Sequence, residues 1–172
     1  GATPLFIACQ EGHPEVARLL LEAGAAVNQA NARGATPLLI SCRLGHLDIV
    51  RLLRDAGASV NQAMDGGATP LIIACQQGHL DIVRLLRDAG ASVNQAMDGG
   101  ATPLFIACQR GHIEVVRLLL SASAAVNQAR VDGWTPLLVA CEKGHVEIAR
   151  LLLSASAAVN HARDTGATPL FI

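Results

Sequence analysis

Thr3-Pro4-Leu5-Phe6-Ile7-Ala8-Cys9 is an apolar stretch that returns along the chain at a fixed interval of 33 residues. Its Thr-Pro-Leu part recurs at Thr36, Thr69, Thr102, Thr135 and, in a last partial copy, Thr168. A fixed period in this range indicates a stack of supersecondary units, each of which contacts mainly its neighbours. The chain of 172 residues therefore divides into units at 1–33, 34–66, 67–99, 100–132 and 133–165, followed by a partial unit at 166–172.

The first half of each unit predicts a buried helix. Thr3 can accept hydrogen bonds from the free N–H groups of a first turn, and Pro4 suits the first helical position, where no N–H donor is needed. The following residues, 5–9, are apolar without a break, as expected for a helix that is covered on several sides. Gly12 ends this helix, because glycine readily adopts the left-handed conformation that closes helices.

The second half of the unit predicts another helix and a loop. A second helix is expected directly after His13, because Val16, Ala17, Leu19 and Leu20 give the helical spacing of an apolar face. Gly24 closes this second helix, and a connection rich in Gly and Asn leads to Gly34, which indicates a turn or hairpin tip. Each unit is therefore predicted as helix, tight turn, helix and protruding loop.

Composition excludes several classes of protein. Hydrophobic residues make up 51% of the chain and aromatic residues 2%, so the core must be aliphatic. A net charge of −1 and a pI near 6.6 argue against nucleic acid or an anionic membrane as the partner. Charged residues interrupt every apolar run before it could span a bilayer, and no signal peptide is expected at the start. If the protein is natural, we expect it in the reducing cytoplasm.

One cysteine occurs in each unit, at Cys9, Cys42, Cys75, Cys108 and Cys141. Equivalent positions of stacked helices should lie about 8–10 Å apart, which is too far for a disulfide. We therefore expect buried free thiols.

The Cys9 and His13 pair suggests a zinc site, but Gly12 breaks the helix between them and four convergent ligands are missing. We predict no metal and no cofactor.

The sequence offers no candidate for catalysis. It contains no nucleophile elbow, no Gly-rich phosphate loop and no paired carboxylates outside its surface helices. Each His, Cys and Thr that could act as base or nucleophile instead recurs with the period, as scaffold residues do. We therefore predict that the protein is not an enzyme.

The repeated pattern G-x-TPL-x-x-A, GH-x-x-x-V/A-x-LL and GA-x-VN resembles the ankyrin repeat over the whole chain. The resemblance implies an all-α solenoid of stacked antiparallel helix pairs with short β-hairpin loops, which together make a single domain over residues 1–172. It also implies that the first helices and the loop tips form a concave surface that holds a protein or peptide partner. The recurring histidines, by the same resemblance, would hydrogen-bond near the Thr-Pro turn.

The chain departs from the family pattern at several positions. Ser123 and Ser156 replace the glycines of the first three units at Gly24, Gly57 and Gly90. If this position requires a positive φ, each serine costs about 1 kcal/mol, and we expect a local loop shift. The Asp that is usual in the loop is also absent, which puts a side-chain-to-backbone bond at Asn31 and its equivalents in doubt.

The second helices carry a ladder of Arg residues, each preceded by an acid at i−3, such as Glu15 and Arg18. We interpret this ladder as a solvated outer face. The alternative is a groove for an acidic partner on the same face.

The candidate binding residues are those that vary between the units, at the loop tips and at the end of each first helix. Trp134 and Arg43 stand out, since Trp and Arg often dominate binding energy. Packing of Trp134 against its own loop is an equally good interpretation. The candidates are Gln10, Glu11, Arg33, Arg43, Leu44, Met64, Asp65, Gln76, Gln77, Met97, Asp98, Gln109, Arg110, Val131, Asp132, Trp134, Glu142 and Lys143.

Two interpretations of the function remain. The first is a protein-binding scaffold, and the second is an engineered or consensus-like array without a natural partner, because residues 45–71 and 78–104 are identical. No terminal unit carries the polar face of a cap, and residues 1–7 reappear as residues 166–172. We therefore expect head-to-tail self-association, unless caps lie outside these residues.

Overall fold

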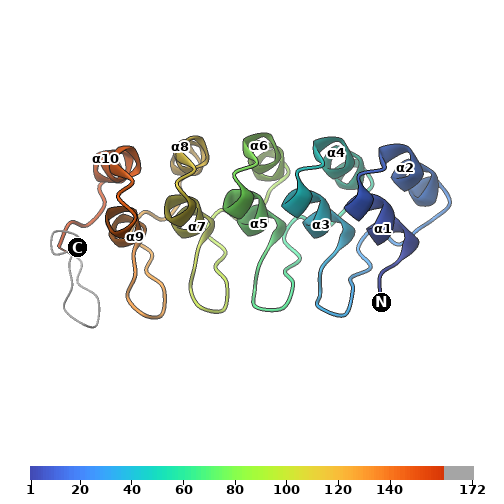
Figure 1. Ribbon diagram of the computed structural model, residues 1–172, viewed down its shortest axis with the longest axis horizontal. Coiled ribbons are helices and arrows are strands. Elements are labelled where there is room, and N and C mark those ends of the chain that lie inside the picture. Colours follow the sequence, from blue (N-terminus) through green and yellow to red (C-terminus); the bar gives the residue numbers. More distant parts are fainter. Residues whose placement is uncertain (161–172) are drawn as a thin grey trace. The chain divides into compact units, whose positions relative to one another are not determined.

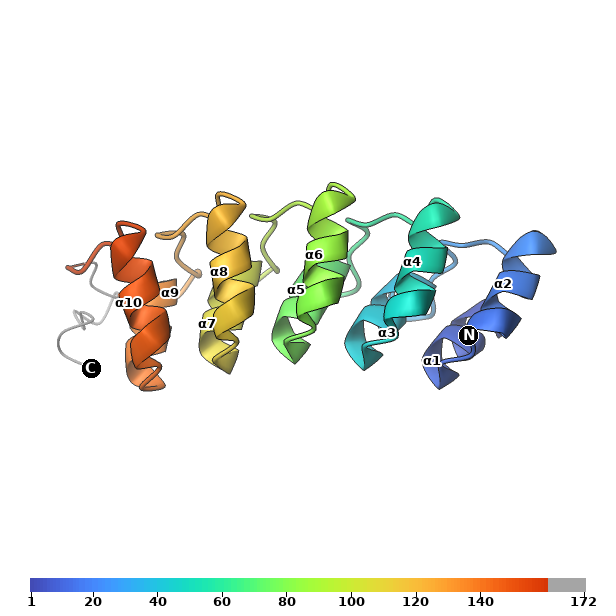
Figure 2. The same cartoon turned by 90° about the horizontal axis from the view of Figure 1, so that it is seen from above.

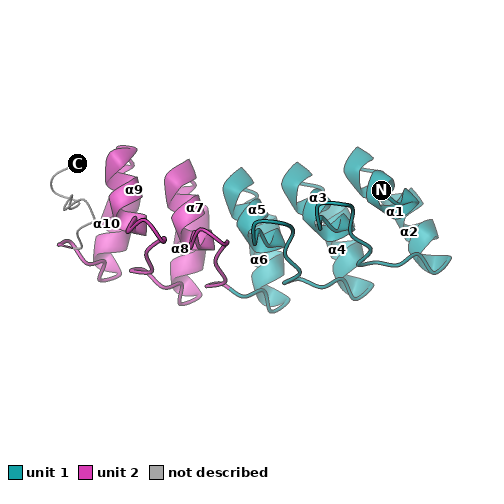
Figure 3. Cartoon of the chain, turned by 90° about the horizontal axis from the view of Figure 1, so that it is seen from below, with its two compact units in different colours: residues 1–92 teal, residues 93–172 magenta. Residues whose placement is uncertain are grey.

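The computed structural model describes residues 1–160 of the chain. These residues form ten helices and no β-strand, so the all-α prediction is confirmed. The chain divides into two compact units that are each larger than one 33-residue repeat. Unit 1 comprises Gly1–Ser92 and unit 2 begins at Val93 (Figure 3). The partial repeat predicted at 166–172 lies outside the described residues.

Each repeat contributes a first and a second helix. Unit 1 contains α1 Pro4–Glu11, α2 Pro14–Glu22, α3 Pro37–Leu44, α4 Leu47–Asp55, α5 Pro70–Gln77 and α6 Leu80–Asp88. The described part of unit 2 contains α7 Pro103–Arg110, α8 Ile113–Ser121, α9 Pro136–Glu142 and α10 Val146–Ser154. In unit 1, α3 packs between α1 and α5 and also against α4, while α2, α4 and α6 follow one another in a second layer. Figures 1 and 2 show these two layers within each unit, with the loop tips projecting from the side of the first helices.

The predicted start and stop signals of the first helix operate as expected. The hydroxyl oxygen of Thr36 accepts from the Leu39 amide at 3.2 Å, and Pro37 occupies the first turn. Thr36 itself is only 1% exposed, so this bond satisfies a buried amide. Gly45 then ends the helix at φ 80°, and its N–H donates to Ser41 O.

The first helices supply most of the core. Leu38, Leu39 and Ile40 are each 1% exposed. They are buried because α3 is covered on three sides, by α1 of the preceding repeat, α5 of the following repeat and α4 of its own repeat. Burying an aliphatic side chain of this size stabilises the fold by about 1.5–3 kcal/mol. The second helices bury one face only, for example Ile49, Val50 and Leu53 of α4, and leave the other to solvent.

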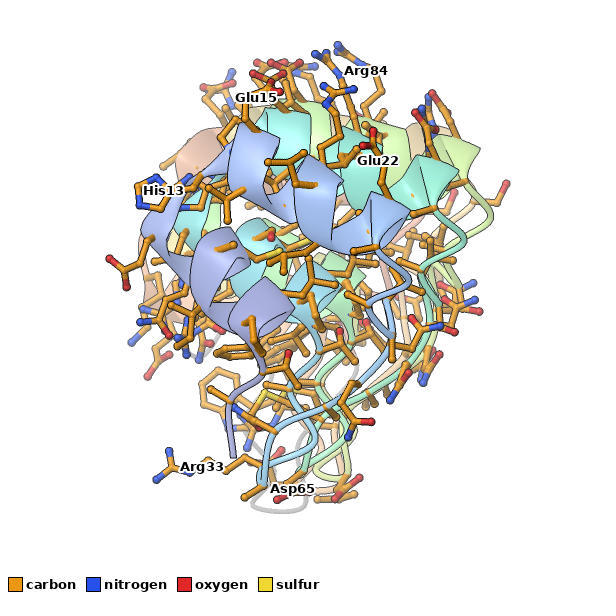
Figure 4. The ribbon with its side chains drawn as sticks, turned by 90° about the vertical axis from the view of Figure 1, so that its right-hand side faces the viewer. His13, Glu15, Glu22, Arg33, Asp65 and Arg84 are labelled. Carbon is orange, nitrogen blue, oxygen red and sulfur yellow. The ribbon has the colours of Figure 1, made fainter. Side chains whose placement is uncertain are left out.

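The exposed face of the second helices carries the predicted ladder of ion pairs. In unit 1 the Arg51 and Asp48 side chains lie 3.2 Å apart, and the same i,i+3 pair recurs between Arg84 and Asp81 at 3.3 Å. Figure 4 shows Glu15 and Arg84 pointing outward from this layer, away from the tips. Since both arginines are more than half exposed, each pair contributes less than about 1 kcal/mol. The ladder is therefore a solvated face whose charges are already balanced.

Ser123 and Ser156 adopt the left-handed conformation that the glycines adopt in the other repeats. Their φ values are 61° and 66°, against 82° for Gly57. The turn itself does not open, because the Ser123 amide still donates to Leu120 O at 3.1 Å, as the Gly57 amide donates to Arg54 O at 2.9 Å. The serines therefore hold the glycine conformation under strain, without the change in the turn that we expected.

Replacing Ser123 and Ser156 with glycine is expected to raise the free energy of unfolding by about 1 kcal/mol per site. A side chain at positive φ costs about 1–2 kcal/mol, and the flexibility of glycine in the unfolded chain offsets part of the gain. Urea denaturation of the double variant measures the effect. Ser59→Gly is the control, because Ser59 does not have a positive φ and its replacement should be destabilising. A double variant that is less stable than the parent would contradict the prediction.

Candidate functional site

The loop tips are tight turns held by hydrogen bonds. In the first tip the Gly34 amide donates to Asn31 O at 3.0 Å, and the Asn31 amide donates to Ala35 O at 2.9 Å. The Asn31 side-chain oxygen also accepts from the amides of Arg33 and Ala35, at 2.9 and 3.1 Å. The bond that the sequence put in doubt is thus present in this repeat. These connections are hairpin-shaped, although none of the residues in the described range forms a β-strand.

Neighbouring tips within each unit are bonded to one another. In unit 1 the Asp65 amide donates to Arg33 O at 3.0 Å, and in unit 2 the Val131 amide donates to Gly99 O at 3.2 Å. Figure 4 shows Arg33 and Asp65 side by side at the foot of unit 1. The backbone that carries the variable tip residues is therefore fixed by its neighbours.

An asparagine ladder, which sequence analysis missed, also links the repeats. Asn28 Oδ1 accepts from the Ser59 amide at 2.8 Å, and Asn61 Oδ1 accepts from the Ser92 amide at the same distance. Asn94 and Asn127 repeat the bond in unit 2. The signal in the sequence was the Val-Asn pair that recurs once in each repeat. A short side chain that both donates and accepts suits a bridge between two backbones.

The predicted site residues all lie at least partly exposed. Half-exposed positions are Gln10, Met64, Gln76, Met97, Gln109, Asp132 and Trp134. More exposed positions are Glu11, Arg33, Arg43, Leu44, Asp65, Gln77, Asp98, Arg110, Val131, Glu142 and Lys143. Among them Leu44 and Val131 are apolar, at 44% and 76% exposure.

Four of the predicted residues line one hollow in unit 1. Gln10 of α1, Arg43 of α3 and the tip residues Arg33 and Met64 surround it, above a floor that includes Phe6, Leu39 and Ile40. Its volume is about 390 Å³. Glu11, Leu44 and Asp65 are not part of its lining.

In unit 2 the tip before α9 forms a polar and aromatic cluster. The Arg130 guanidinium lies 5.3 Å from the ring centre of Phe105 in α7 and 3.0 Å from an Asp132 carboxylate oxygen. The Arg130 amide donates to Trp134 O at 2.9 Å, and the Trp134 amide donates to Asp132 Oδ1 at 3.5 Å. The candidate residues from the sequence included Asp132 and Trp134 but not Arg130 or Phe105. Their contact depends on how the tip folds back over the helix.

The histidines have a different role from the one implied by the resemblance. His46 Nε2 lies 3.3 Å from Gln10 O at the end of the preceding first helix, rather than at the Thr-Pro turn. A Cβ on Gly12 would stand 2.9 Å from His46 Cε1, and His79 covers Gly45 in the same way. The expected location was wrong, because the histidine ring reaches back over the glycine of the previous repeat. At Gly12, Gly45 and Gly111 glycine is thus required for two reasons, a positive φ and the space taken by the histidine ring.

The cysteines are free and mostly buried. Desolvation raises the pKa of Cys9 to about 11, although a hydrogen bond with Ser41 partly lowers it. Burial raises the pKa of Cys42, Cys75 and Cys108 still further, so these thiols stay protonated and inert at neutral pH. Within residues 1–160 no cluster of His, Cys, Asp and Glu is placed to hold a metal ion.

Short antiparallel helix pairs, stacked in two layers with bonded tips on one side, define a helical repeat protein. The profile of the family described as ankyrin repeats (3 copies) matches residues 1–64, 60–130 and 122–172. The chain therefore belongs to the ankyrin-repeat family, whose members generally mediate protein–protein interactions and are typically not enzymes. The comparison with curated proteins found no match. Across the described residues, no helix has the length and apolar character needed to cross a membrane.

Proposed function

We propose that residues 1–172 act as a single ankyrin-repeat domain that binds a protein or peptide through the first helices and the loop tips. The observation that carries this proposal is the location of the variable residues. Apart from the identical tips at 64–66 and 97–99, the tips and first-helix ends vary between otherwise similar repeats, and all the candidate residues there are at least partly exposed. Exposed variation on a constant scaffold is typical of recognition surfaces.

The fixed geometry of the tips supports a binding role. The bond between Asp65 and Arg33, and that between Val131 and Gly99, hold neighbouring tips within each unit. A partner that binds a surface already ordered loses less conformational entropy than one that must order it. Trp134 and Arg110 supply in unit 2 the residue types that often dominate binding energy. The proposed role is not catalytic, and five free thiols favour a reducing compartment.

A comparison of two charge-matched variants tests this proposal. The first carries Arg43→Gln and Trp134→Ala, which introduce the residues found at the equivalent positions Gln76 and Ala101 and so preserve the fold. The control carries Arg51→Gln on the outer face. We expect a partner isolated with the parent chain to be retained by the control and lost by the first variant. Retention by both, at equal affinity, would reject the proposed surface.

The identity of residues 45–71 and 78–104 favours a second candidate, an engineered array without a natural partner. The coding sequence distinguishes the two. Synonymous codons scrambled between the identical segments would support engineering, whereas shared codons would support recent duplication.

We also propose that the outer side of α1 and α2 binds a second copy of the chain. Ile7 and Val16 are 45% and 48% exposed there, whereas the equivalent Ile40 and Ile49 are covered by the preceding repeat and are each 1% exposed. The predicted complementary end, residues 166–172, lies outside the described range. Light scattering across a concentration series should show association that Val16→Glu abolishes. A monomer at all concentrations would exclude it.

A further inference from the structure

The hollow in unit 1 at the loop tips differs in charge from a second hollow on the same unit. Its lining includes the arginines Arg33 and Arg43 and no Asp or Glu. By contrast, a hollow on the outer face of the same unit is lined by Arg18 and Arg51 together with Glu15, Asp48 and Asp55. The outer hollow has three acids against two arginines, whereas the hollow at the tips carries an excess of positive charge.

Within residues 1–160 neither arginine has an acidic side chain at ion-pair distance. Ion pairs among the described residues involve the outer-face arginines, Arg130 and Lys143, and none involves Arg33 or Arg43. Both side chains are exposed, so their guanidinium groups are available to an incoming group. A guanidinium binds a carboxylate through two parallel hydrogen bonds, which a neutral amide cannot reproduce.

The backbone holds both arginines in place before any ligand arrives. The Arg33 amide donates to Asn31 Oδ1 at 2.9 Å, and Arg33 O accepts from Asp65 at 3.0 Å. Arg43 lies in the last turn of α3, whose end is fixed by Gly45. Figure 4 shows the Arg33 side chain reaching sideways from the tips of unit 1. Two arginines on a fixed backbone around one hollow favour a single anionic group.

We propose that this hollow binds a peptide segment of a partner protein that presents one Asp or Glu side chain to Arg33 and Arg43. This inference rests on the proposed function and names the chemistry of its ligand. Glu11 and Asp65 stand next to lining residues without joining the lining. Their negative charges disfavour a continuous acidic run, so the recognised carboxylate should be flanked by uncharged residues.

Selection from a displayed library of random linear peptides tests the proposal with the full chain. Peptides retained by the parent should be enriched in a single Asp or Glu. Their affinity should fall roughly tenfold or more in the Arg33→Gln, Arg43→Gln double variant, as expected for lost charge-assisted hydrogen bonds. The double variant Arg51→Gln, Arg84→Gln, on the outer faces of α4 and α6, is the charge-matched control and should bind as the parent does. Gln already occupies the positions equivalent to Arg43 at Gln10, Gln76 and Gln109, so this change leaves the fold intact.

A synthetic version of a selected peptide allows a double-mutant cycle between its acid and the two arginines. Replacing its acid with Gln should weaken binding to the parent chain as much as the double variant does, with no further loss when both changes are combined. Peptides without an acid, or an acid whose removal has no effect, would overturn the inference and leave the protein-binding role intact. A library that yields no binder would overturn both. Displacement of the selected peptide by inorganic phosphate, with its Gln version still bound, would assign the hollow to a different anion.

Discussion

Above about pH 9 the protein is expected to lose stability steeply, by about 5 kcal/mol per pH unit, because four buried thiols resist ionisation. Burial raises the pKa of Cys9 to about 11 and that of Cys42, Cys75 and Cys108 further, from an ordinary value of 9.0. The unfolded chain therefore releases protons above pH 9 that the folded chain retains. Each such thiol changes the free energy of unfolding by about 1.4 kcal/mol per pH unit.

The sign of this effect is fixed by which state holds the proton. Below pH 9 the thiols are protonated in both states and stability does not depend on them. Between pH 9 and the raised folded value, proton release favours the unfolded chain, so stability falls as pH rises; for Cys9 the fall ends near pH 11. Few other groups titrate in this window, since the chain has no tyrosine and one lysine, Lys143.

Urea denaturation at a series of pH values from about 8 to 10.5 measures the slope. Cys75→Ala should remove about a quarter of it, whatever its effect on stability at neutral pH. Cys141→Ala is the matched control, because Cys141 is only half-buried and should contribute less. An equal slope in the parent and in Cys75→Ala would show that another group drives the alkaline transition.

The helices could be predicted from the sequence because their signals are local. Thr36 and Pro37 start α3 and Gly45 ends it through contacts within a few residues, and the same signals recur in each repeat. The period then indicates which helices are neighbours. Local capping and a fixed repeat are together sufficient for an all-α fold of this kind.

The candidate site could be predicted only in part, because its contacts cross between repeats. That Arg33 and Arg43 line one hollow depends on how a tip lies against the next first helix. The contact of His46 with the carbonyl of Gln10 likewise joins residues from two repeats. Variation indicated which residues face outward, but the constant Asn28 was overlooked because a residue that never changes gives no contrast.

The partners of Arg130 were missed for a similar reason. Its neighbour Phe105 lies in α7, the first helix of the same repeat, where an apolar residue was expected to be core. Phe105 is indeed 1% exposed, and the Arg130 guanidinium lies over its ring. A side chain can thus serve as core and as the base of a surface cluster at once.

Gly100→Ala is expected to lower the free energy of unfolding by about 2–4 kcal/mol, whereas Gly99→Ala, one residue earlier, should change it by less than about 1 kcal/mol. Gly100 has a φ of 82°, which strains any side chain. A Cβ there would stand 2.9 Å from Arg130 Cα and 3.0 Å from Val131 N. A Cβ on Gly99 meets nothing within 4 Å, and Gly99 does not have a positive φ.

The clash at Gly100 cannot be relieved cheaply, because both contacted atoms belong to the backbone of the next tip. Moving that tip away would stretch the bond from the Val131 amide to Gly99 O, now 3.2 Å, and shift Arg130 off the Phe105 ring. Chemical denaturation of the two variants measures the difference in stability. Hydrogen exchange of the Val131 amide should also accelerate in Gly100→Ala and not in Gly99→Ala. Similar stabilities for the two variants would mean that the tips are not held against one another as the backbone bond indicates.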